Sequence, residues 1–104
     1  MESDKVQEMQ FLEQGLHNLI LQKQAFQMEL SETESALKEI EKTSEIYKIL
    51  GQLMIKSDKN NIKKELENKK KLLEVRLKTI EKQESALSEK VDKLREEFIN
   101  NQKK

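Results

Sequence analysis

The sequence predicts an all-α-dominated fold, a long antiparallel two-helix coiled coil with a short β-hairpin between the helices. Two observations predict it: apolar residues recur every three or four positions over two long runs, and a β-branched apolar stretch separates those runs. Composition agrees, because the 104 residues include no Pro, no Trp and two Gly, and 38% are charged. We expect one domain over 1–104, with helices over about 5–42 and about 58–100 and a hairpin over about 45–56.

Each apolar run follows the alternating three- and four-residue spacing of a coiled-coil seam, and eight of its ten positions are apolar. The first comprises Met9, Leu12, Leu16, Leu19, Lys23, Phe26, Leu30, Thr33, Leu37 and Ile40. The second comprises Leu66, Lys70, Leu73, Leu77, Ile80, Glu84, Leu87, Val91, Leu94 and Phe98. A 3.5-residue period implies a left-handed coiled coil. Asp4 with Gln7 can cap the first helix, and Ser57 or Asp58 the second.

Residues 45–56 read as a β-hairpin around a single turn signal. Gly51, at the first position of a two-residue turn, permits the positive φ of a type II′ turn, which matches the twist of the strands. The resulting opposed pairs are Leu50 with Leu53, Ile49 with Met54 and Lys48 with Ile55, and each pair of residue numbers adds to 103.

The same register applied to the helices places apolar seam residues opposite each other, for example Leu30 and Leu73. The polar exceptions Lys23 and Glu84 then fall in adjacent layers, where the two charges can meet diagonally. We therefore expect one folded-back chain, with its two ends together at one tip and its strands at the other.

Both faces of the predicted hairpin are apolar. A two-stranded hairpin is marginal alone, and two diverging helices cannot cover both of its faces and both of its edges. We therefore expect an oligomerisation element that other subunits bury, rather than a hairpin packed on its own helices. Its residues are Ile46, Tyr47, Ile49, Leu50, Gly51, Leu53, Met54 and Ile55.

The chain ends carry more apolar side chains than one seam can bury: Val6, Met9, Phe11, Leu12, Phe98 and Ile99. Met9, Leu12 and Phe98 also finish the coiled coil, whereas Phe11 and Ile99 lie off the seam. An exposed apolar side chain at a free tip has nothing else to pack on, so it favours contact with another protein.

Several classes of function are disfavoured. No Cys is present, which excludes disulfides and thiolate metal sites, and the lone His17 has no base, nucleophile or ligand partner. The 20 basic and 20 acidic residues argue against nucleic acid, and no stretch approaches a membrane span or a secretory leader. We expect a cytoplasmic non-enzyme without metal or cofactor.

Two segments, IYKILGQLMIK from Ile46 to Lys56 and LLEVRLKTIEKQE from Leu72 to Glu84, resemble the β-type subunit of prefoldin, in its archaeal form. The resemblance spans nearly the whole chain, and the single hairpin is similar to the β type because the α type carries two. It implies a hexamer of two α-type and four β-type subunits whose hairpins build a double β-barrel platform. Residues 45–50 and 53–56 would supply the strands.

The resemblance further implies a holdase, a chaperone that holds unfolded client polypeptide between its coiled-coil tips without ATP and delivers it to a group II chaperonin. The client-binding residues would then be the six apolar residues at the chain ends. Two other functions remain: a structural coiled-coil tether or adaptor docking one fixed protein partner, and a catalytic subunit. A tether needs no hairpin with two apolar faces, and this feature distinguishes the tether from the holdase.

Overall fold

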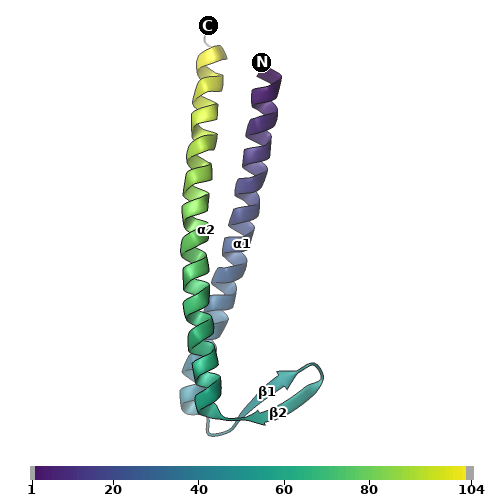
Figure 1. The fold of residues 1–104 in the computed structure, drawn as a ribbon, viewed down its shortest axis with the longest axis vertical. Coiled ribbons are helices and arrows are strands. Elements are labelled where there is room, and N and C mark those ends of the chain that lie inside the picture. The colour runs from purple at the N-terminus through teal and green to yellow at the C-terminus, as the bar shows by residue number, and fades with distance from the viewer. Residues whose placement is uncertain (1, 103–104) are drawn as a thin grey trace. The chain divides into compact units, whose positions relative to one another are not determined.

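The computed structural model describes residues 2–102. The elements follow in the order α1 (Glu2–Lys42), β1 (Ile46–Leu50), β2 (Leu53–Ser57) and α2 (Lys59–Gln102), as Figure 1 shows. Two long helices with a short antiparallel hairpin between them confirm the predicted fold class.

The helix starts differ in how they are capped. The α2 start is as expected, because the Asn60 N–H donates to Asp58 Oδ1 at 3.0 Å, while the Ile62 N–H donates to the Asp58 carbonyl at 3.0 Å. The predicted capping box of Asp4 and Gln7 is wrong, since α1 already begins at Glu2. No Gly or Pro lies before Asp4 to keep the helix from beginning upstream of it. Asp4 and Gln7 therefore lie within the first turns of α1.

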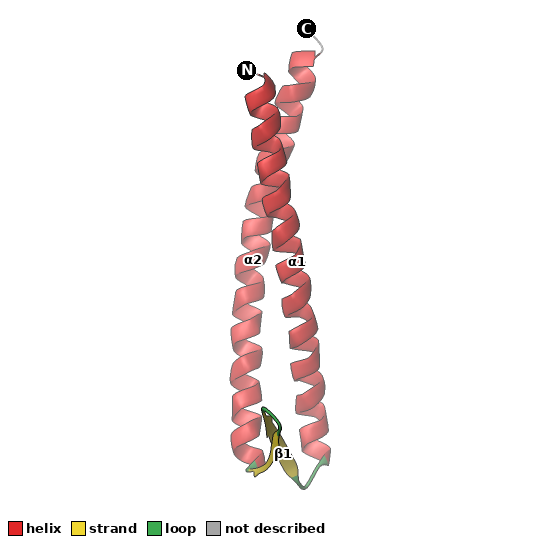
Figure 2. Cartoon of the chain, turned by 90° about the vertical axis from the view of Figure 1, so that its right-hand side faces the viewer, coloured by secondary structure: helices red, strands yellow, loops and turns green. Residues whose placement is uncertain are grey.

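The chain packs as two compact units, and both helices pass through both of them. The first unit combines residues up to Ala25 with those from Leu77 onward, and the second contains Phe26–Arg76. Within the second unit, the hairpin leaves the ends of α1 and α2 and projects to one side of them (Figures 1 and 2).

The predicted seam is the core. All twenty of its positions are buried or part-buried, although most residues of the chain are exposed. The apolar residues that are almost fully buried all belong to it: Ile40, Leu73, Leu77, Ile80 and Val91. Thr33, a polar seam residue, is only 3% exposed, and its hydroxyl donates to the Glu29 carbonyl at 2.8 Å. That bond satisfies the hydroxyl within its own helix.

The predicted diagonal contact between the polar seam residues is confirmed. Lys23 Nζ donates to Glu84 Oε2 at 3.1 Å, and the two side chains are only 29% and 26% exposed. Partial burial makes the pair more sensitive to the loss of one partner than a fully exposed ion pair, because the remaining charge stays partly removed from water. The pair therefore favours one register of the two helices within the first unit.

We predict that Lys23→Met and Glu84→Leu are energetically coupled. Each single change leaves one part-buried charge without its partner. The double variant should therefore lose less unfolding free energy than the two single losses added together, by about 0.5–1 kcal/mol. Urea unfolding of the four proteins measures this coupling.

Cysteine crosslinking provides an independent check, because no native Cys competes. Leu16→Cys should crosslink with Leu87→Cys, and the pairing of Leu16→Cys with Ile80→Cys, shifted by one heptad, should not. Absence of coupling together with efficient crosslinking of the shifted pair would show that the register is wrong.

Candidate interaction surfaces

The hairpin has the register and turn that its sequence predicts. Its closing pairs are Leu50 with Leu53 and Ile49 with Met54, and Gly51 has a φ of +60°. No other described residue has a positive φ, so Gln52 does not, which excludes a type I′ turn and agrees with type II′. A Cβ at Gly51 would meet no atom within 4 Å. Glycine is therefore favoured here by backbone conformation and not by lack of space.

Both faces of the hairpin are open to water in the isolated chain. On one face, Tyr47 is 51% exposed, Ile49 68% and Met54 67%. On the other, Leu50 is 52% exposed, Leu53 66% and Ile55 43%. So much exposed apolar surface on so short an element is typical of a protein interface.

The hairpin contacts its own helices at its root and through Lys48. Ile46 is part-buried and lines a hollow of 380 Å³ with Ile40, Ile62 and Leu66. Beyond it, Lys48 Nζ lies 3.4 Å from Glu65 Oε2, an exposed ion pair that ties β1 to α2. The alternative that the helices cover the hairpin does not hold, because the apolar residues nearer the turn stay exposed.

The six apolar residues predicted at the chain ends, here called the chain-end surface, divide into two groups. Phe11 is 75% exposed and Ile99 50% exposed, and both lie off the seam as expected. The four part-buried members are Val6, Met9, Leu12 and Phe98. The Arg95–Glu13 pair at 2.8 Å and the Lys5–Glu97 pair at 3.8 Å join the two helices in the same unit.

Four further exposed apolar residues were not predicted from the sequence: Leu21, Met28, Leu72 and Val75, between 50% and 67% exposed. For two of them, the position in the heptad was a signal that the sequence offered. Leu21 and Met28 are seven residues apart on the side of α1 that faces away from the seam, where charged residues are usual.

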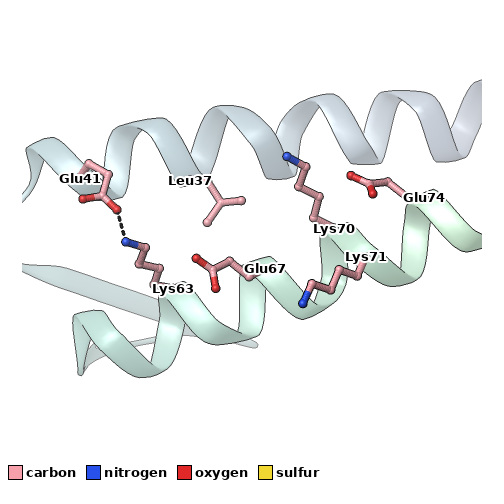
Figure 3. A pocket seen from close by; sticks show the side chains of 7 residues that line it. All are labelled: Leu37, Glu41, Lys63, Glu67, Lys70, Lys71 and Glu74. Carbon is pink, nitrogen blue, oxygen red and sulfur yellow. Dashed lines mark ion pairs between the residues drawn. The ribbon is translucent and has the colours of Figure 1, made fainter.

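The second unit contains a groove of 480 Å³ between its helices, lined by Leu37 and by charged residues of both signs (Figure 3). Glu41 and Lys63 reach toward each other across it. Their hydrogen bond and attraction lower the pKa of Glu41 and raise the pKa of Lys63. Both shifts favour the charged forms at neutral pH, so this pair is unsuited to exchanging protons.

Residues 2–102 hold neither a cluster of metal ligands nor a membrane-spanning helix. His, Asp and Glu side chains there form no group of three or more that could hold a metal ion. Neither described helix has a stretch long and apolar enough to cross a membrane.

Comparison with known proteins agrees with this architecture. The family model described as "Prefoldin subunit" matches residues 3–104. Prefoldin subunit beta of Thermococcus onnurineus is 43% identical over 85 residues, which cover 79% of this chain and 73% of the relative. The Pyrobaculum islandicum protein of the same name is 41% identical over 86 residues, covering 80% of this chain and 69% of the relative.

A solved structure extends the likeness to three dimensions. The crystal structure of the prefoldin beta subunit from Thermococcus strain KS-1 superimposes with a TM-score of 0.86 at 34% identity, covering 95% of this chain and 90% of that one. Sequence relatives and the structural match agree on the β type, as does the single hairpin between two long helices. This chain is a member of the prefoldin family of chaperone subunits, and of its β type.

Proposed function

We propose that the chain is an ATP-independent holdase subunit that binds unfolded polypeptide at its chain-end surface and delivers it to a group II chaperonin in the cytoplasm. One observation carries the proposal: exposed apolar side chains cluster on the hairpin, and the exposed Phe11 and Ile99 add apolar surface near the two chain ends, on a highly charged chain. Two such surfaces suit two tasks, assembly and client binding.

Assembly follows from the hairpin. In an antiparallel ladder, alternate residue pairs turn their backbone N–H and C=O groups outward, so each strand presents a free edge. Strands from neighbouring subunits satisfy those edges, and the resulting sheet buries both apolar faces. The assembly we propose is the hexamer of two α-type and four β-type subunits that the family likeness implies.

Client binding at one chain-end surface is weak. A few exposed side chains gain about 25 cal/mol per Å² of buried apolar area, and much of that gain is offset by the ordering of a flexible client. Several subunits acting on one client raise the avidity by roughly 10²–10⁴-fold. Because each contact is weak, the client exchanges between sites and leaves without nucleotide hydrolysis. A fixed tether would instead need one strong, specific contact.

We predict that Ile55→Asp disperses the oligomer formed with an α-type partner while helix content stays near wild type. The new carboxylate would enter the apolar face that partner subunits cover, and the directly opposed Lys48 is already paired with Glu65, so burial of the charge should cost several kcal/mol. Light scattering measures the particle mass and circular dichroism the helix content.

Gln52→Asp is the matched control, because it places the same charge in the exposed turn of the same hairpin. It should leave the mass unchanged. An Ile55→Asp particle of wild-type mass would refute assembly through the hairpin.

We also predict that Phe11→Ser with Ile99→Ser raises the particle concentration needed to prevent aggregation of a denatured client by at least about tenfold. Every β-type subunit loses its exposed apolar contacts at once, so the multivalent affinity falls by a product of factors. Aggregation is followed by turbidity.

The control for this experiment is Leu21→Ser with Met28→Ser, which removes exposed apolar residues away from the chain ends. Both double variants should assemble normally, and only the first should lose protection. Equal protection by the first variant and wild type would move client binding to another surface.

A further inference from the structure

The two flanks of the seam differ near the chain ends, within the first unit. On one flank, the Arg95 guanidinium lies 2.8 Å from Glu13 Oε1 and bridges the helices. On the other flank there is a groove of 290 Å³, here called the end groove. Its lining residues are Glu8, Leu12, Lys90, Lys93 and Leu94. The groove and the Arg95 bridge flank the seam on opposite sides, because Glu13 directly follows seam residue Leu12 whereas Glu8 precedes it by four positions.

The second unit shows how such a flank is closed. There, Glu29 and Lys69 form an ion pair at 3.1 Å. Glu29 lies three heptads after Glu8, and Lys69 lies three heptads before Lys90, so the two pairs occupy equivalent positions along the two helices. Yet Lys90 belongs to none of the ion pairs found among the described residues. The end groove is therefore open, whereas the Glu29–Lys69 ion pair closes the equivalent flank in the second unit.

Apolar surface continues from the end groove along α1. Phe11 is 75% exposed and stands three residues after Glu8, on the same flank. Gly15 follows four residues later and has no side chain, and a Cβ there would lie 3.3 Å from Leu87 Cδ2. The Leu87 side chain thus packs closely against the α1 backbone at Gly15, about one helical turn from Phe11.

The residues that line the end groove carry net positive charge. Lys90 and Lys93 contribute two positive charges against the single negative charge of Glu8. Lys93 has only a loose partner in Glu89, at 3.9 Å with both side chains 72% exposed. Both ammonium groups are thus available to a ligand, while the Leu12 and Leu94 side chains form an apolar floor.

We propose that the end groove receives an apolar side chain of an extended client segment, and that Lys90 and Lys93 favour segments in which acidic residues flank that side chain. The inference rests on the proposed holdase function and refines it by naming the class of client sequence. The apolar floor supplies affinity for any unfolded chain, and the lysines supply the preference among chains. Glu8 opposes acidic ligands in the same groove.

The test uses the particle assembled with an α-type partner and short fluorescent peptides that share one central Leu-Phe-Leu segment. The segment is flanked by Asp, by Asn or by Lys, and fluorescence anisotropy measures binding. At low salt the Asp-flanked peptide should bind about three- to tenfold more tightly than the Asn-flanked one, and the Lys-flanked peptide most weakly. At about 1 M salt, where the Debye length is about 3 Å, the preference should vanish.

Three variants separate the groove from general electrostatics. Lys90→Gln with Lys93→Gln should abolish the preference, and Glu8→Gln should strengthen binding of the Asp-flanked peptide by about twofold. Lys78→Gln with Lys82→Gln removes the same charge from exposed positions of the same unit outside the end groove, and should retain the preference.

Peptide binding that ignores flanking charge, or an equal loss of preference in the Lys78 and Lys82 variant, would overturn the end-groove proposal. If the wild-type particle nonetheless suppresses aggregation, the holdase function stands and the groove assignment alone fails. A particle that neither binds the peptides nor suppresses aggregation would overturn both.

Discussion

The structure depends on one apolar seam. Two paired helices can bury a single strip of side chains each, and here all twenty seam positions are removed from water to some degree. Many apolar residues outside that strip remain in solvent unless another chain covers them. The exposed side chains of the hairpin and the exposed Phe11 are therefore not failures of packing. They are the surface that a two-helix chain has available for other proteins.

A repeating seam does not by itself select one register, because a shift by one heptad again places apolar residues opposite apolar residues. Two local features remove that ambiguity. The two-residue turn at Gly51 fixes the strand pairing. The part-buried Lys23–Glu84 pair stabilises only one register of the helices in its unit. A turn glycine and one ion pair thus supply a specificity of register that the far larger apolar area cannot supply.

The features predictable from sequence were those that short-range rules decide. Heptad spacing located the seam, turn chemistry gave the hairpin register, and the two combined to bring Lys23 to Glu84. The predicted start of α1 was wrong, because a favourable cap at Asp4 does not prevent the helix from beginning earlier when the preceding residues also tolerate helix.

The open flank beside Leu12 was not predictable from the pattern. Glu8 with Lys90 and Glu29 with Lys69 occupy equivalent heptad positions, yet only the second pair is formed. Which of two such pairs closes depends on the conformations of long, flexible side chains and on their neighbours, and heptad spacing does not encode these. The roles of the hairpin and chain-end residues in assembly and client binding remain predictions.

The exposed hairpin makes the proposed assembly depend on the concentration of the partner chains. In the proposed assembly its apolar faces are covered only while partners are bound, so the free energy that holds the subunit together grows with the logarithm of partner concentration. Dilution alone would weaken the particle. A cell that makes more β-type than α-type chain would accumulate subunits with unpaired strand edges, which are prone to pair with one another. In the proposed assembly, balanced synthesis of the two subunits would keep those edges paired.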